Sequence, residues 1–245
     1  MKRYICIIVL ICMGLSLSAQ RRKEKLTLLP SFEVKVDGDL TEWADRLMPV
    51  DQDSSWSVAV SNDATFIYAA VRIKDIALQQ EAARNGVIIN INTDGKKRDG
   101  AQLIFPIPDS ESIRAMINDE NLPEMNVREE LIRRSRGYGV HGFARIVDGR
   151  LSFDNRYGVR AAARLDDQDV LVYESQIPIQ ALGLSDAQQK VAIQCLLNNR
   201  FTMLKQALKD RPSTRAGVYG NRRPTVKSPY RMPTEMWVVT TLNEN

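Results

Sequence analysis

Short apolar runs alternate with clusters of turn-forming residues along most of the chain. The runs are rich in β-branched and aromatic residues, and Gly, Asp, Asn and Pro separate them, which is the pattern of a mainly β protein. Alternation is clearest at 66–73, where the odd-numbered residues are apolar and would face a core, while the even-numbered residues face the other way. The predicted strands are FEVKV (32–36), WSVAV (56–60), TFIYAAVRI (65–73), GVIININ (86–92), AQLIF (101–105), YGVRAAARL (157–165), VLVYESQI (170–177), KVAIQCLL (190–197) and EMWVVTTL (235–242).

Helical periodicity is confined to three connections between the predicted strands. These are residues 76–84, 110–118 and 126–136. No internal repeat and no second boundary is visible, and the chain length fits one large β-sandwich or barrel. The sequence therefore predicts an all-β, jelly-roll-like antiparallel sandwich over residues 20–245, with a few short helices in the connections.

The N-terminus has the pattern of a secretory signal peptide. Lys2 and Arg3 precede an apolar run at 5–15 and the small residues Ser18 and Ala19. The run is well short of the roughly 20 residues that a membrane helix needs, and no later run is longer. We therefore expect a signal peptide at 1–19 and a periplasmic or secreted mature chain without a transmembrane segment.

Charge and cysteine content exclude some classes of protein. The formal net charge is +4 at pH 7, and the predicted cleavage removes two positive charges, so we expect no nucleic acid partner. Two of the three cysteines, Cys6 and Cys12, lie in the signal, and bulky Ile11 disfavours acylation at Cys12. Cys195 then has no partner for an intramolecular disulfide, and its apolar neighbours predict a buried, inert thiol.

The segment at 205–233 is basic, rich in turn residues and interrupts the β pattern before the last strand. A loop of this length is functional or mobile more often than it is a plain connection. A solvated loop is the simpler interpretation. Its arginines, with Tyr219 and Tyr230, would alternatively contact a sugar, a polyanion or another envelope protein.

Catalytic sequence motifs are absent. The chain has no HExxH, GxSxG, Walker A or GxGxxG sequence. His141, the single histidine, lies in the Gly-rich segment GYGVHGF and is more typical of a loop than of a catalytic base. Paired carboxylates could cleave glycosides, but no pattern identifies a pair. We therefore expect no enzymatic activity.

The segment NINTDGKKRDG (90–100) matches half of a calcium-binding loop. Asn90, Asn92 and Asp94 stand where such a loop has its first ligands, but Ala101 occupies the position of the bidentate glutamate. Three consecutive cations, at 96–98, also oppose cation binding. A hairpin turn that uses the Asp-Gly pair explains the same residues.

The stretch VDGDLTEWADRL (36–47) forms a compact local unit. The Asp37-Gly38 pair favours a tight turn after the predicted strand 32–36, and Thr41 is placed to cap a short helical turn. Trp43 would then pack on the edge of the sandwich as a large apolar plug. The stretch is therefore predicted to be structural.

Three sequence landmarks, which include this stretch, occur in the same order as in the family 9 carbohydrate-binding modules and the wider DOMON-like group, and the chain resembles these proteins. The landmarks are the turn and acidic-Trp motif at 37–43, the turn and strand from Asn62 to Asp75, and the strand that leads into Ile-Pro and a short helix at 171–184. The resemblance covers most of residues 32–198, and implies a jelly-roll-like sandwich in a stand-alone exported form of the Bacteroidetes type. The matching positions are Asp37, Gly38, Glu42, Trp43, Tyr68, Asp75, Glu174 and Pro178.

The resemblance implies a non-catalytic protein that binds a polysaccharide or oligosaccharide. Such modules clamp sugars between Trp rings, helped by polar side chains, and several hold structural calcium. No cofactor is predicted, and calcium is left open. Because Trp43 belongs to the fold motif, other aromatic residues supply the rings, although core packing competes for both remaining tryptophans. The predicted ligand-binding residues are Trp56, Trp237, Tyr219, Asn198 and Arg200.

Two alternatives to sugar binding stay open. Some DOMON-like domains bind haem through a Met and a Lys or His ligand, which here would use His141 with Met203, Met232 or Met236. Covalent haem attachment is excluded because there is no CxxCH motif. The second alternative is a scaffold or protein-interaction role in the cell envelope, with 205–233 as the contact.

Overall fold

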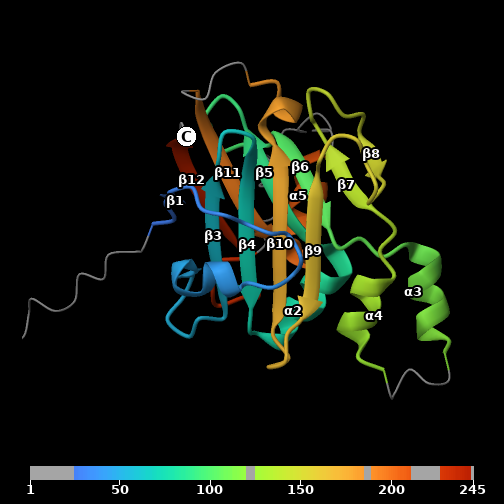
Figure 1. Ribbon diagram of the computed structural model, residues 1–245. Helices are drawn as coiled ribbons and strands as arrows, with labels where there is room; N and C mark the ends of the chain where they lie inside the picture. Colours follow the sequence, from blue (N-terminus) through green and yellow to red (C-terminus); the bar gives the residue numbers. More distant parts are fainter. Residues whose placement is uncertain (1–24, 120–124, 185–188, 211–226, 244–245) are drawn as a thin grey trace, which may run out of the picture.

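Two β-sheets face each other and enclose the core of the protein (Figure 1). The computed structural model describes residues 25–119, 125–184, 189–210 and 227–243. The predicted β-sandwich class is confirmed. The predicted signal peptide (1–19) and Tyr219 lie outside the described residues. No helix in the described part of the chain is long and apolar enough to cross a membrane.

Sheet A, in front in Figure 1, has the strand order β1-β3-β4-β10-β9, and β2 pairs with β3. All of its pairs are antiparallel except β1 with β3. Its strands are β1 (Leu28–Leu29), β2 (Met48–Pro49), β3 (Trp56–Asn62), β4 (Phe66–Ile73), β9 (Arg160–Leu165) and β10 (Leu171–Pro178).

Sheet B lies behind sheet A and is antiparallel throughout, in the order β12-β11-β5-β6-β7-β8. The predicted hairpin between 86–92 and 101–105 is confirmed as β5 and β6. The strands of sheet B are β5 (Val87–Asn92), β6 (Ala101–Phe105), β7 (Tyr138–His141), β8 (Gly149–Leu151), β11 (Lys190–Leu197) and β12 (Glu235–Thr241).

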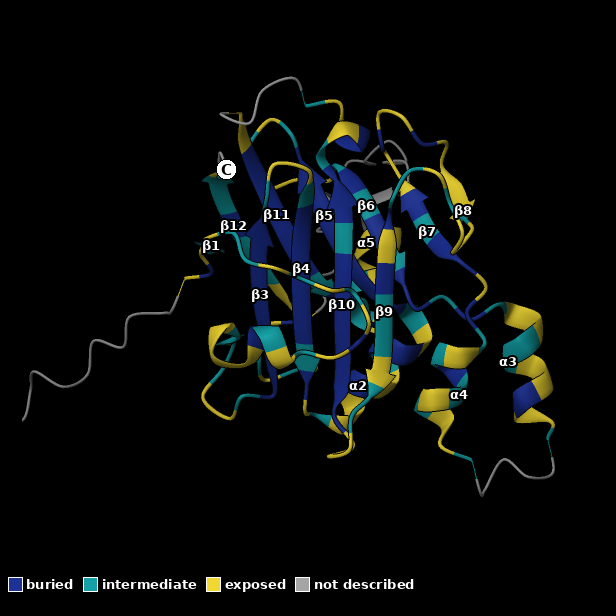
Figure 2. Cartoon of the chain, viewed as in Figure 1, coloured by how far each residue is buried: buried dark blue, intermediate teal, exposed yellow. Residues whose placement is uncertain are grey.

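The main core fills the space between the sheets. On β4 the odd-numbered residues from Ile67 to Ile73 face this core, as the alternation predicts. Cys195 belongs to it as well, and burial raises the pKa of its thiol to about 12, which agrees with an inert side chain. Figure 2 shows the central strands of both sheets buried along most of their length.

The even-numbered face of β4 is also buried, because the N-terminal segment crosses the outside of sheet A (Figures 1 and 2). Trp43 packs there against Ala59, Tyr68 and Ala70. The prediction that 32–36 forms a strand is wrong, since this segment makes no ladder and instead lays apolar side chains on the sheet. Trp43 accordingly covers a face of sheet A rather than its edge.

A short 3-10 helix, η2 (Thr41–Arg46), carries Trp43. The prediction that Thr41 caps this turn is wrong, because Thr41 is its first residue and the N-cap position, Leu40, makes no side-chain cap. Oδ1 of Asp39 instead accepts the backbone N–H of Thr41 at 3.1 Å and its hydroxyl at 2.6 Å. Gly38 has φ +85°, a conformation that suits glycine. The predicted tight turn at 37–38 is therefore present without the strand that was expected to precede it.

Glu174 of β10 fixes this segment to sheet A. Its carboxylate is fully buried and accepts three hydrogen bonds, from the backbone N–H groups of Asp37 (3.2 Å) and Gly38 (2.9 Å) and from Nε1 of Trp43 (2.8 Å). Burial raises the pKa of this carboxyl to about 7, against the three donors, which lower it. Two of the sequence landmarks therefore meet at one buried carboxylate.

The helices occupy the connections, as predicted. The first two, α2 (Ile76–Asn85) and α3 (Ser110–Ile117), match their predicted ranges, and α4 (Val127–Arg133) is shorter than predicted. Asp75 caps α2 by accepting the N–H of Leu78 at 2.9 Å. The 3-10 turn η4 (Ile179–Leu182) follows Pro178, and α5 (Arg200–Asp210) was not predicted.

Candidate functional site

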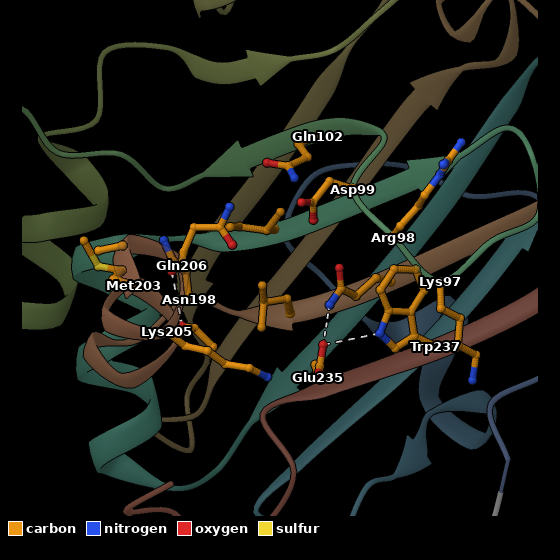
Figure 3. Close-up of a pocket in the computed structure, with 15 residues that line it drawn as sticks. Lys97, Arg98, Asp99, Gln102, Asn198, Met203, Lys205, Gln206, Glu235 and Trp237 are labelled. Carbon is orange, nitrogen blue, oxygen red and sulfur yellow. Dashed lines mark hydrogen bonds between the residues drawn. The ribbon is translucent and has the colours of Figure 1, made fainter. Parts of the chain in front are cut away.

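The outer face of sheet B, turned away from sheet A, holds a groove with a volume of about 840 Å³. Its apolar floor is formed by Ile88 of β5 and Leu196 of β11, which are register partners. Gln194 of β11 and Gln102 of β6 lie beside this floor, in the row of paired residues that is two residues further along the strands. We call this feature the sheet B groove (Figure 3).

Two walls rise from the floor at opposite ends of the strands. The β5–β6 loop forms one wall at Lys97–Asp99. The other wall is α5, which contributes Thr202, Met203, Lys205, Gln206 and Ala207. In Figure 3 these two walls lie on either side of the strands.

A cap positions α5 against the groove. Asn199 is fully buried, and its Oδ1 accepts the N–H of Thr202 at 3.0 Å, which is the interaction of an N-cap residue. Asn198 joins the start of the helix to the end of α2, because its Nδ2 donates to the carbonyl of Asn85 at 2.9 Å. The beginning of α5 is therefore held by buried polar contacts.

Trp237 and Glu235 of β12 close one end of the groove. The indole Nε1 of Trp237 donates to Oε2 of Glu235 at 3.3 Å, and Nε2 of Gln194 donates to the same oxygen (Figure 3). Oε1 of Gln194 in turn accepts from Nδ2 of Asn90 at 3.1 Å. The ring and the amide are thus held in place before any ligand arrives.

Buried asparagines shape the loop wall. Oδ1 of Asn90 accepts the N–H of Gly100 at 2.8 Å, and Oδ1 of Asn92 accepts the N–H groups of Asp94 and Lys96, both at 3.1 Å. These oxygens are the ones that a calcium loop would offer to the ion. The predicted turn is therefore confirmed, and among the described residues no cluster of three metal-ligating His, Cys, Asp or Glu side chains is found.

The predicted ligand-binding residues separate into different environments. Trp237 and Asn198 both line the sheet B groove. Trp56 is fully buried in the main core, where its Nε1 donates to the carbonyl of Pro233 at 2.7 Å, so its ring is not available to a ligand. Arg200 is the exposed first residue of α5 and does not line the groove.

Most residues of the groove were not predicted from the sequence. The prediction of a loop at 205–233 is wrong at its start, because residues up to 210 belong to α5; residues 211–226 lie outside the described part. Gln102 and Gln194 were not among the predicted site residues, although a lone amide in an otherwise apolar strand marks an outward position. Asn199 followed by Thr202 was a usable signal for the start of a helix.

His141 lies at the end of β7, opposite Gln102 in the register. Its side chain is 65% exposed, and Nδ1 contacts the carboxylate of Asp148. An axial haem ligand sits in a pocket that excludes water around the metal, and this surface pairing is a different environment. The haem alternative gains no support from the position of His141.

Comparisons with known proteins give few matches. No family model matches the sequence, and no curated protein matches it. Among solved structures, similarity is found to a family 9 carbohydrate-binding module from Caldicellulosiruptor kristjanssonii in complex with glucose, at 8% identity and a TM-score of 0.34, covering 70% of this chain and 78% of that one. A family 9 module of the same organism in complex with cellotriose gives 8% identity and a TM-score of 0.33, with coverage of 72% and 78%.

Proposed function

We propose that the protein is an exported, non-catalytic carbohydrate-binding protein that acts in the periplasm or outside the cell. The observation that carries this proposal is the sheet B groove, in which the ring of Trp237 lies next to the amide of Gln194, its register partner, and the amide of Gln102 lies further along the groove. Ligand sites combine apolar and aromatic surface with a few fixed polar groups in this way. The groove lies on a sheet, so its floor is rigid.

The chemistry of the groove suits a sugar. The face of a pyranose ring presents C–H groups, which pack against an indole over a large area. Its hydroxyl groups both donate and accept hydrogen bonds, and a side-chain amide also offers both. Gln194 therefore provides a matching partner beside Trp237, and Gln102 provides another further along the groove.

The charges around the groove favour a neutral ligand over a polyanion. Lys97, Arg98 and Lys205 line it together with Asp99 and Glu235. Arg98 also pairs with Asp94 on the same loop. Counted over the described residues that line it, the groove is therefore close to balanced in charge and lacks the one-sided positive field that polyanion binding requires.

Affinity electrophoresis of the chain 20–245 through gels that contain a panel of polysaccharides tests the proposal. We expect at least one polysaccharide to retard the protein. Trp237→Ala should weaken that binding at least about tenfold, or about 1.4 kcal/mol, without lowering the melting temperature appreciably, because the ring is only half-buried. Trp56→Phe should do the reverse, since it changes the core and leaves the groove intact.

Val147→Ala serves as the control, because Val147 is 88% exposed and lies away from the groove, between β7 and β8. It should migrate like the parent chain in every gel. Incubation with the retarding polysaccharide should release no shorter products, since the proposed function is non-catalytic although two carboxylates, Asp99 and Glu235, line the groove. Absence of retardation across the panel, or release of products, would refute the proposed function.

A further inference from the structure

β12 forms one outer edge of sheet B, and it lacks the features that usually protect the edge of a sheet (Figure 1). Its seven residues, Glu235–Thr241, pair one for one with β11 and contain no bulge, Gly, Pro or positive charge. A long, regular, apolar edge is a template for pairing with another strand, and proteins usually avoid it. In the described part of the chain, no strand pairs with the outer side of β12.

The other edges of the two sheets are short or protected. At one edge of sheet A, β1 and β2 have only two residues each. At its other edge, β9 carries the exposed residues Arg160 and Arg164, and α4 lies beside it. The far edge of sheet B is β8, which has three residues, among them Arg150. Among the described strands, β12 is therefore the one long edge without protection.

The sequence of β12 is self-complementary in antiparallel pairing. When the strand pairs with its own copy across a two-fold axis at Val238, all seven residues have partners, and the outer faces of the two sheets lie on the same side. On the outer face, Trp237 then lies opposite Val239 of the second copy, which is a favourable aromatic and β-branched pair. On the core side, Val238 meets its own copy, and Met236 lies opposite Thr240 of the second copy.

The ends of the strand are complementary in charge. The same register places Glu235 opposite Thr241 of the second copy, whose hydroxyl can donate to the carboxylate. Lys190 is the register partner of Thr241 on β11, so the second copy also brings a positive charge to this corner. All three residues are exposed. No like charges lie directly opposite each other in this pairing, which would destabilise it.

We infer that β12 is an interface at which two copies of this chain pair edge to edge, antiparallel about Val238, so that their B sheets form one continuous sheet. The two-fold axis is perpendicular to this sheet, and both sheet B grooves therefore open on the same face. Trp237 of the second copy lies diagonally across the interface from Trp237, at the end of the groove that Trp237 and Glu235 close. The second copy thus contributes an indole to that end, whatever the groove binds.

Sedimentation velocity of the chain 20–245 over a range of concentrations tests the inference. We expect a monomer–dimer equilibrium with a dissociation constant of about 1–100 µM, because one pair of strands buries a small area. Thr241→Glu places like charges opposite each other twice in the dimer, against Glu235, and should weaken dimerisation at least about threefold. Thr241→Lys, at the same position, should not weaken it, because opposite charges then meet.

Arg150→Gln is the matched control, because it changes the charge by the same amount as Thr241→Glu, at the far edge of sheet B. It should dimerise like the parent chain. Melting temperatures of all variants show that they are folded. A chain that stays monomeric up to about 200 µM, or a dimer whose dissociation constant is the same in Thr241→Glu and Thr241→Lys, would overturn the inference. Either result would leave the proposed function standing, because the polysaccharide gels test that function separately.

Discussion

The indole N–H groups of the three tryptophans have different partners. That of Trp43 donates to the buried carboxylate of Glu174, that of Trp56 to a main-chain carbonyl, and that of Trp237 to the exposed side chain of Glu235. The first two rings have no exposed surface, whereas the third is half-buried. The three tryptophans therefore have three different roles: Trp43 covers the outer face of sheet A, Trp56 packs in the main core and Trp237 lines the sheet B groove.

At a pH above the raised pKa of Glu174, where this carboxyl is charged, Trp43→Phe should lower the free energy of unfolding by about 2 kcal/mol. The substitution removes the only donor to Oε1 of Glu174 among the described contacts, and a hydrogen bond to a charged group contributes about 1.5–3 kcal/mol. Urea denaturation measures the loss. Trp237→Phe is the matched control and should change stability by less than about 0.5 kcal/mol, as half-exposed positions do. Equal losses in the two variants would contradict the role given to Glu174.

The stability of the protein should fall as the pH rises from about 4.5 to about 7. In this interval the folded chain keeps a proton on Glu174 that the unfolded chain, with its ordinary pKa of 4.5, has released. The raised pKa corresponds to about 3 kcal/mol lost across the interval, with no further loss above it. Urea denaturation at several pH values measures this slope.

Glu174→Gln should flatten the slope, because the amide does not titrate. The carboxyls with lowered pKa values, such as Asp63 and Glu130, change the stability only at pH values below their ordinary pKa near 4. Their effect therefore lies outside this pH interval. A slope that persists unchanged in Glu174→Gln would assign the effect to another group.

At the scale of elements, one cluster of hydrogen bonds, partly exposed at Asp169, joins α4 to its neighbours. Arg128 donates two hydrogen bonds of 2.8 Å to the carboxylate of Asp169, in the β9–β10 turn, and a further one to Gln79 of α2. Gln79 is fully buried and donates to three main-chain carbonyls, one of them that of Asp169. The cluster therefore holds two helices and a turn together.

Arg128→Ala should destabilise the protein by about 1–2 kcal/mol, because it leaves Gln79 with an unmatched buried oxygen. The matched control is Arg133→Ala on the same helix, whose side chain is 69% exposed and whose pairing with Glu130 is worth about 0.5 kcal/mol or less. Thermal unfolding, monitored by circular dichroism, measures the loss of stability in each of the two variants. If the control costs as much as Arg128→Ala, the cluster is not what holds α4.

The elements that the sequence predicts well are those whose pattern is local. Residues 66–73 alternate, 76–84 have helical spacing behind the cap Asp75, and Asp94-Gly95 marks a turn, and each was found where predicted. The segment 32–36 alternates as a strand does, yet its partner is the face of sheet A. An alternating pattern of apolar side chains predicts that one side of a segment is buried. It does not show whether the segment pairs as a strand within a sheet or packs on the face of one.

The candidate site was harder to predict for the same reason. Trp56 and Trp237 both stand in apolar strand sequence, and only the pairing of the strands shows that one faces the core and the other the groove. Gln102 and Gln194 come from segments almost a hundred residues apart and meet only through β5. Long-range register is not encoded in any short motif.

At the scale of the whole molecule, the outer faces of the two sheets differ in what packs on them. That of sheet A is covered by the N-terminal segment, which packs Trp43 on it. That of sheet B, in the described part of the chain, holds the groove between α5 and the β5–β6 loop, with amides and one indole on its floor and at its end. Covering one face stabilises the sandwich, and the groove on the other face is where we propose that the ligand binds.

Hydrogen–deuterium exchange of the chain 20–245, with and without the polysaccharide that retards it most, tests the location of the site directly. We predict slower exchange on binding at the amides of 96–100 and of the first turns of α5, which form the two walls of the groove. The segment 30–47, on the outside of sheet A, should exchange at an unchanged rate. Protection of 30–47 with unchanged exchange at both groove walls would place the ligand on the other face and contradict the account.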